Sequence, residues 1–139
     1  MMQGSDHTAT STEARRPHDQ PDSAAMRIAD HISRVIDTIE IANDEEGLNA
    51  FITVDRDGAM AAASAADKRR AASRTLGPLD GVPIAVKDNL DTAGQRTTFG
   101  LGIHRDRVPD TDADVVFRLR AAGAVIVGKT NMTELACGT

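Results

Sequence analysis

One lysine in this chain stands where a side chain could act as a base. Residues 77–94 read GPLDGVPIAVKDNLDTAG, and the apolar run inside this stretch ends on Lys87. Turn-forming residues flank the run, so a strand would deliver this amine between two ordered turns. Desolvation beside an apolar strand favours the neutral amine, and a lysine of lowered pKa can accept a proton near neutral pH. The pattern makes Lys87 a candidate general base, with an ordinary solvated lysine as the alternative.

Residues 123–130 match the phosphate-loop pattern G-x-x-x-x-G-K-T. That motif requires its four middle residues to form a loop whose backbone amides surround phosphate oxygens. Here the four residues are Ala, Val, Ile and Val, which are typical of a strand, and a helical pattern precedes them. We therefore expect Lys129 to be a lysine at a strand end next to a turn, and not a nucleotide ligand.

The sequence predicts no metal site. Residues 55–58 resemble the middle of a calcium-binding loop, but its first and twelfth positions are Thr53 and Ser64, which carry no carboxylate. The four histidines are scattered, and none pairs with Cys137 at the spacing of zinc ligands. We expect Cys137 to be a small buried side chain, because nothing in the sequence indicates a base or a lowered pKa that would activate its thiol. We expect His31 to be exposed on the first helix.

Length and composition exclude several classes of protein. The 139 residues allow one domain or less. With 16 basic and 21 acidic residues the chain is acidic, and no dense basic run could follow a nucleic-acid backbone. No apolar stretch reaches the ~18 residues of a membrane span, and no apolar core of a secretory signal follows the first methionines. We therefore expect neither nucleic-acid nor membrane partners, and a cytoplasmic location is the default.

Hydrophobic periodicity predicts an α/β fold in which helices pack on a mixed or parallel sheet that is incomplete in this chain. The polar residues 1–21 are expected to form a disordered tail. The predicted helices cover residues 23–42, 58–74 and 111–122, the predicted strands cover 82–86 and 124–127, and a short apolar run covers 48–54. We expect the two strands to lie side by side as part of a right-handed α/β unit, each with an exposed edge.

Polar residues and a glycine supply the expected helix ends. Asp22 or Ser23 could cap the first helix. Thr111 could cap the third, with Asp114 completing a capping box and a glycine ending the helix at position 123. The buried face of the third helix is expected to consist of three apolar side chains, namely Val115, Val116 and Leu119.

Four blocks of the chain resemble the amidase signature family, a group of serine hydrolases that cut carboxamide bonds. The blocks are residues 48–52, the lysine-bearing stretch 77–94, the pair Thr97-Thr98 with Gly100, and residues 112–139, which read DADVVFRLRAAGAVIVGKTNMTELACGT. The similarity runs from about residue 23 to the last residue. No single block is decisive, but four blocks in the order of the family are highly specific.

The resemblance implies a Ser–Ser–Lys mechanism, in which one serine attacks the amide carbonyl, a second serine bridges, and a lysine takes and returns the proton. Lys87 matches that lysine by its VKD context, with Asp88 and Asn89 supporting the loop, and Lys129 matches a structural lysine. Gly138 and Thr139 are expected to border the substrate cleft. Both catalytic serines of the family would lie beyond Thr139, and the resemblance implies no cofactor.

On this resemblance, residues 22–139 form a truncated N-terminal part of an amidase domain. Alone, the chain is expected to be inactive and prone to aggregate, because a lysine base without its serines has nothing to activate. If completed, it would act on a small-molecule amide, and a second chain carrying the serines could be its partner. Two alternatives stay open: a portion like the A subunit of the glutamyl/aspartyl-tRNA amidotransferase, which releases ammonia from glutamine, and a non-catalytic binding fragment that uses the helical surface of residues 23–74.

Overall fold

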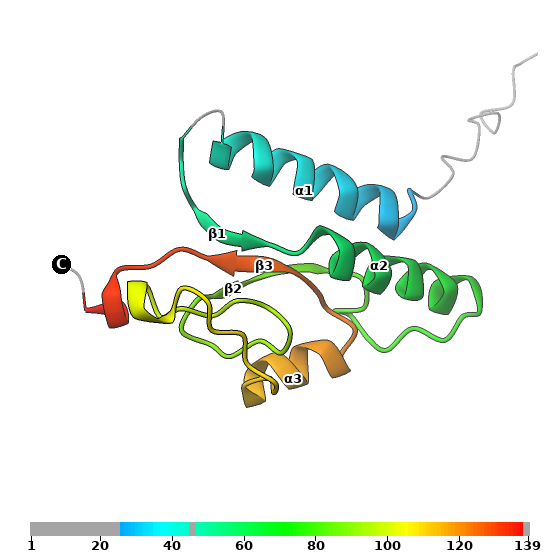
Figure 1. The fold of residues 1–139 in the computed structure, drawn as a ribbon. Helices are drawn as coiled ribbons and strands as arrows, with labels where there is room; N and C mark the ends of the chain where they lie inside the picture. The colour runs from blue at the N-terminus through cyan, green and yellow to red at the C-terminus, as the bar shows by residue number, and fades with distance from the viewer. Residues whose placement is uncertain (1–25, 45–46, 138–139) are drawn as a thin grey trace, which may run out of the picture.

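The computed structural model describes residues 26–44 and 47–137, which form a mixed sheet between two layers of helices (Figure 1). The elements in chain order are α1 (Ile28–Asp44), β1 (Phe51–Val54), α2 (Arg56–Ala71), β2 (Pro83–Lys87), α3 (Asp114–Ala121) and β3 (Val125–Thr130), with short 3₁₀ turns at Gly102–His104 and Glu134–Ala136. Helices α1 and α2 lie on one face of the sheet and α3 lies on the other. The predicted α/β class is confirmed. The predicted tail, residues 1–21, lies outside the described residues.

Strand β3 lies in the centre of the sheet, in the order β1-β3-β2. It pairs with β2 in parallel and with β1 antiparallel. The segment β2–α3–β3 is thus the expected α/β unit with neighbouring parallel strands. The prediction that both strands expose an edge is wrong for β3, because the apolar run before α2 forms β1 and covers its second edge. In the described part of the chain, β2 remains an edge strand.

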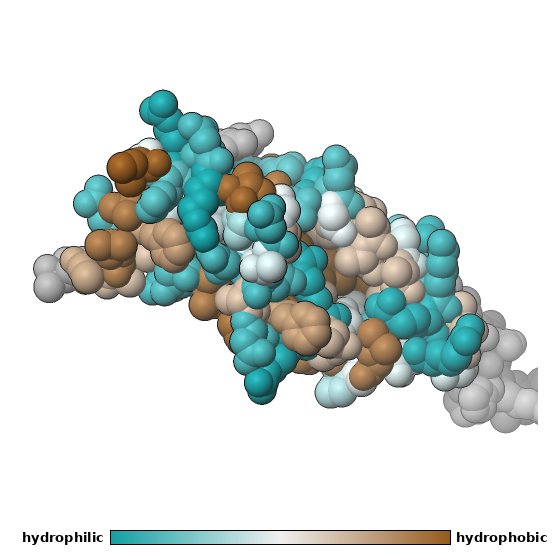
Figure 2. Space-filling view, turned by 60° about the horizontal axis from the view of Figure 1, so that its bottom comes forward, coloured by the Kyte–Doolittle hydropathy of each residue, from teal (hydrophilic) through white to brown (hydrophobic). Residues whose placement is uncertain are grey.

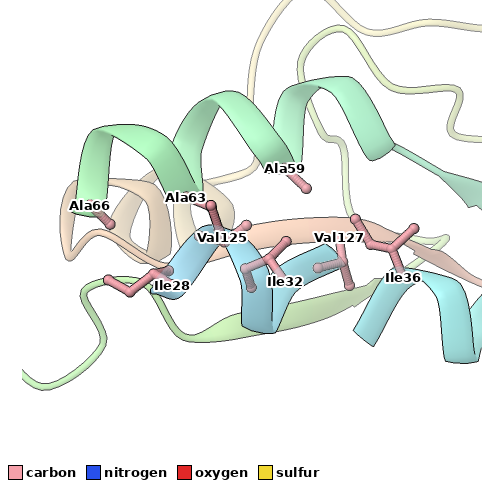
Figure 3. Close-up of a cluster of buried hydrophobic side chains, with 9 residues drawn as sticks. Ile28, Ile32, Ile36, Ala59, Ala63, Ala66, Val125 and Val127 are labelled. Atoms are coloured by element: carbon pink, nitrogen blue, oxygen red, sulfur yellow. The ribbon is translucent and has the colours of Figure 1, made fainter. Parts of the chain in front are cut away.

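The larger core joins α1, α2 and β3 (Figure 3). Isoleucines spaced four apart on α1 face alanines of α2, and two valines of β3 lie beneath both helices. Alanine has the highest helix propensity and the smallest apolar side chain, so an alanine face allows α2 to pack closely against α1 and the sheet. The residues of this core include Ile28, Ile32, Ile36, Ala59, Ala63, Ala66, Val125 and Val127.

A second, smaller core lies under the other face of the sheet. It joins Val86 of β2, Ile126 of β3 and Val116 of α3, all buried. Leu119 is partly buried against it, as expected, but Val115 is 46% exposed. The expectation for Val115 is wrong because the short helix α3 packs on the sheet through a narrow apolar stripe, which contains Val116 and Leu119 but not Val115.

The N-terminus of α1 is capped by a residue far away in the sequence. The first amides of α1, on Ile28 and Ala29, donate to the Asp67 carboxylate of α2 at 2.8 and 3.1 Å. The predicted caps Asp22 and Ser23 lie outside the described residues, and α1 begins at Ile28. Helix-to-helix capping therefore fixes the N-terminus of α1 on α2 and satisfies two of its free amides.

The predicted capping box on α3 is wrong. Ala113 is the N-cap residue and has no side-chain cap, and Asp114 pairs with Arg118 at the surface. The carboxylate of Asp112 instead accepts from the amide of Ala93 at 2.7 Å, since the loop after β2 returns to this point. The predicted helix end is confirmed, because Gly123 follows α3 with φ +86°, a conformation that glycine adopts without strain.

Apolar side chains on the α3 side of the molecule are interspersed with polar ones (Figure 2). Phe117 of α3 is 63% exposed, and Val115 of the same helix is half-exposed. Scattered apolar residues of this kind are ordinary on protein surfaces and need no partner. Among the described residues, no helix combines the length and the apolar character needed to cross a bilayer.

Candidate active site

Lys87 is the last residue of β2, and its side chain is exposed. Successive side chains of a strand point to opposite faces. Val86 points into the smaller core beside α3, so Lys87 points to the face that carries α1 and α2. Ala85, on the same face as Lys87, is exposed as well. The helices thus leave this end of β2 uncovered, and the desolvated setting expected for Lys87 is not supplied by the described residues.

Among the described residues, no strand pairs with the edge of β2 that faces away from β3. The carbonyl of Val82 accepts from the amide of Val125 at 2.8 Å, and the amide of Asp88 donates to the carbonyl of Thr130 at 3.2 Å. Even-numbered residues of β2 therefore bond to β3, and the peptide groups of the odd-numbered residues point to the other edge. Ala85 and Lys87 belong to this second set. The carbonyl of Lys87 accepts from the amide of Leu90 at 3.0 Å within the turn, so a further strand could add along β2 up to the lysine.

Asp88 anchors the chain directly after Lys87. Its side chain is completely buried. One carboxylate oxygen, Oδ2, accepts from the amide of Thr98 at 2.9 Å and from the hydroxyl of Thr98 at 2.5 Å. The amide of Phe99 donates to the carbonyl of Asp88 at 3.2 Å. Asp88 thus fits the supporting role expected of it, whereas the side chain of Asn89 is exposed.

Lys129 of β3 is the second lysine near this site, and it is completely buried. Its ammonium group donates to the carbonyl of Leu90 at 2.8 Å and to the hydroxyl of Thr97 at 2.6 Å. The Asp88 oxygen Oδ1 lies 3.5 Å from the same ammonium and has no hydrogen-bond donor. Desolvation lowers the pKa of Lys129, and the charge of Asp88 opposes that shift. Since β3 runs through this position, the rejected phosphate-loop pattern is a strand, as predicted.

Arg107 joins two parts of the loop that follows β2. Arg107 donates from both terminal nitrogens to Asp91, each at 2.7 Å, and its guanidinium lies 5.0 Å from the centre of the Phe99 ring. Hydrogen bonds from Arg107 lower the pKa of Asp91. This pair was not predicted, because nothing local in the sequence marks a salt bridge between residues 16 positions apart. The Thr97-Thr98 pair is marked in the sequence only by the family resemblance.

A pocket of about 250 Å³ lies near the carboxyl ends of β2 and β3. It is lined by backbone and side chains of the loop after β2, the start of β1 and the residues after β3, and Lys87 is not among them. Arg96, at its wall, donates to the carbonyl of Ile52 at 2.7 Å. The lining residues are Ile52, Arg96, Thr98, Gly100, Leu101, Gly102, Arg105, Asn131 and Met132.

The remaining predicted site residues have mixed outcomes. The prediction that Cys137 is buried is wrong: its side chain is exposed, because it follows a 3₁₀ turn beyond the end of β3, where the neighbouring side chains are also exposed. His31 is exposed, as predicted. Gly138 and Thr139 lie outside the described residues. Across residues 26–44 and 47–137, no three or more His, Cys, Asp or Glu side chains are grouped so that they could hold a metal ion.

The apparent calcium loop around Asp55 has another structural role. The Asp55 carboxylate accepts from the amide of Gly58 at 3.0 Å and caps α2. Its second oxygen accepts from the side-chain amide of Gln95 at 2.7 Å. Asp55 therefore ties the start of α2 to the loop that follows β2.

Comparison with known proteins identifies the family. The model of the family described as Amidase matches residues 30–139. The A subunit of glutamyl-tRNA(Gln) amidotransferase from Azoarcus sp. (strain BH72) is 56% identical over 99 residues, which are 71% of this chain and 20% of that protein. The corresponding protein of Salinispora tropica is 51% identical over 104 residues, which are 75% of this chain and 21% of that protein.

The fold agrees with this match. The crystal structure of an amidase family protein from Bacillus anthracis str. Ames superposes with a TM-score of 0.74 at 30% identity, over 81% of this chain and 22% of that chain. The chain thus spans about a fifth of the length of the curated relatives it matches. By its sequence and its fold, the chain belongs to the amidase signature family.

Proposed function

We propose that this chain supplies the lysine-bearing part of an amidase active site, with Lys87 as the general base in the hydrolysis of a carboxamide C–N bond. The observation that carries the proposal is the contrast between the two neighbouring lysines. Lys129 is buried and fully engaged, whereas Lys87 leaves the sheet on an uncovered face. Of the two, only Lys87 is free to exchange a proton with a reacting group.

The open side of β2 supports the idea that more protein covers this site. A further strand along the free edge of β2, with its connections, would lie against Ala85 and Lys87 and exclude water from the amine. Exclusion of water favours the neutral form of a lysine, which is the form that accepts a proton. The chain has no serine after Ser73, so the nucleophile and the bridging serine would come from the added part.

In the proposed reaction, the hydroxyl oxygen of the nucleophilic serine forms a bond to the amide carbonyl carbon. Its proton passes through the bridging serine to Nζ of Lys87. The lysine then returns the proton to the amide nitrogen as the C–N bond breaks, which leaves an acyl-enzyme and a free amine. Water repeats the sequence on the ester, releasing the acid and restoring the serine.

Glutamine is a second candidate substrate within the same chemistry. The relatives named above are subunits of an enzyme called glutamyl-tRNA(Gln) amidotransferase. A protein that resembles these relatives would hydrolyse the side-chain amide of glutamine and release ammonia. Partner subunits would then belong to the complete enzyme, in addition to the part that carries the serines.

The proposal is tested with a chimera. Residues 1–139 are fused to the part of the Azoarcus protein that follows its matched stretch, and the release of ammonia is measured on glutamine and on a panel of simple amides. We expect the chain alone to be inactive and the chimera to hydrolyse at least one amide. A folded chimera that is inactive on every amide would contradict the proposal and favour a non-catalytic binding fragment.

A further inference from the structure

We propose that Lys129 is a positioning residue for the catalytic lysine: from the opposite face of the sheet, its buried ammonium fixes the segment of residues 88–98 that continues directly from Lys87. This inference rests on the proposed function of Lys87. It assigns Lys129 no contact with the substrate and no part in proton transfer.

The three polar partners of the Lys129 ammonium lie in that one segment. The carbonyl of Leu90 and the hydroxyl of Thr97 accept at 2.8 and 2.6 Å, and Asp88 Oδ1 lies at 3.5 Å. The first two contacts are hydrogen bonds, and the third is a longer ion pair to an oxygen that has no hydrogen-bond donor. The ammonium therefore joins the start of the segment to its end, across residues that the sheet does not hold.

The two lysines lie on opposite faces of the same strand pair. Lys129 is the register partner of Val86, and paired residues of neighbouring strands point to the same face. Lys87 follows Val86 and points the other way. Lys129 therefore cannot replace Lys87 as a base, but it can fix the position of the backbone at Lys87.

The backbone of Lys87 is linked to the clamped segment at several points. Its carbonyl accepts from the amide of Leu90 at 3.0 Å, the residue whose own carbonyl binds Lys129. The next residue, Asp88, donates its amide to Thr130 and accepts from Thr98 with its carboxylate. Loss of the Lys129 ammonium should therefore displace the turn that follows Lys87.

Only a lysine satisfies this site. The side chain is completely buried, so the larger guanidinium of arginine would need space that the packed interior does not offer. A methionine of similar length would leave the Asp88 carboxylate buried without a counter-charge. The other charged groups that act on Lys129 are Asp91, which favours the ammonium, and Arg107, which opposes it and is itself bound to Asp91.

The test uses the small number of lysines in the chain, which are Lys68, Lys87 and Lys129. Labelling with [¹⁵N]lysine gives three backbone amide signals, and Lys68 on the exposed side of α2 is the internal control. The main variant is Lys129→Met. Because it could fail to fold, Thr97→Val removes one acceptor of the ammonium with little change of shape, and Thr97→Ser keeps that acceptor.

We expect the Lys87 signal to shift or broaden in Thr97→Val and in any folded Lys129→Met, with the Lys68 signal unchanged and the wild-type spectrum kept in Thr97→Ser. In the active chimera, we expect Thr97→Val to lower kcat at least fivefold with KM within twofold, and Thr97→Ser to retain the rate. An unmoved Lys87 signal in folded Thr97→Val, or an unchanged kcat, would overturn the inference. If the parent chimera is inactive, the proposed function fails, while the Lys87 signal still decides whether Lys129 positions this residue.

Discussion

Removing the charge of Lys129 should cost more stability than any other single lysine change in this chain. The ammonium is completely buried, and its loss leaves the Asp88 carboxylate, also completely buried, without a counter-charge. Breaking a buried ion pair from one side costs about 3–5 kcal/mol. A domain of this size has a total stability of about 5–15 kcal/mol, so Lys129→Met should remove a large part of it.

The assay is urea unfolding followed by far-UV circular dichroism, since the chain has no tryptophan or tyrosine for fluorescence. With a urea m-value of about 1–2 kcal/mol/M, a loss of about 4 kcal/mol lowers the midpoint by roughly 2–4 M, or unfolds the chain outright. The matched control, Lys68→Met on an exposed part of α2, should change stability by less than about 0.5 kcal/mol.

A double-mutant cycle separates the ion pair from simple loss of packing. Asp88→Asn in the Lys129→Met background removes the uncompensated charge, so the double variant should be more stable than the sum of the single losses predicts, by about 1–3 kcal/mol. The interpretation of Lys129 and Asp88 as a buried ion pair is wrong if the stability of Lys129→Met lies within about 1 kcal/mol of the wild type. It is also wrong if the losses of the two single variants simply add.

Three further predictions concern the scaffold. Asp80→Ala should lower stability by about 2–3 kcal/mol, measured by thermal unfolding, because the nearly buried Asp80 carboxylate binds Arg69 and fixes the turn before β2 to α2; a loss below about 0.5 kcal/mol would contradict this. Gly128→Ala should cost about 1–3 kcal/mol in urea, since an added Cβ would lie within van der Waals overlap of the Thr53 carbonyl oxygen of β1; a neutral Gly128→Ala would show that β1 and β3 are not closely paired there. Stability should also fall as the pH drops below about 4, because hydrogen bonds from arginines lower the pKa of Asp80 and Asp91 and the unfolded chain then binds more protons; a titration of stability that is flat from pH 5 to 3 would refute this.

Local sequence patterns predicted the elements that hold Lys87. The apolar runs at β2 and β3 are bounded by turn residues, and the helical period between them identifies α3, so the parallel pair with a lysine at its tip could be inferred. The alternation of a strand also predicts that Val86 and Lys87 face opposite sides. These features depend on neighbours within a few positions.

The contacts that the sequence did not reveal join distant residues. The acceptors of Lys129 are 39 and 32 positions away, and one of them is a backbone carbonyl, which any residue type provides. In the same way, the cap of α1 comes from Asp67, 39 positions later, instead of from the polar residues before the helix. The central place of β3 depends on pairing with β1 across more than 70 residues. No periodicity within a short window carries such information.

The burial of Lys87 was inferred from its strand but depends on a separate layer of protein. An apolar strand determines which face its residues occupy, and only an element packed on that face removes water. In the described chain, α1 and α2 cover β1 and β3 on this face but leave Ala85 and Lys87 of β2 exposed. The prediction of a base therefore stands on the position of Lys87 and on the family, and its solvent environment would be set by the added part.

The most direct test of the central claim compares Lys87→Ala with Lys68→Ala in the amide-hydrolysing chimera. Lys68 is exposed on α2, so Lys68→Ala should unfold within about 0.5 kcal/mol of the parent, and far-UV circular dichroism checks that the Lys87→Ala chimera is folded. We predict that Lys87→Ala lowers kcat at least 100-fold, as expected for loss of a general base, and that Lys68→Ala retains the parent rate. A Lys87→Ala chimera that is folded and as active as the Lys68→Ala control would contradict the assignment of Lys87 as the base.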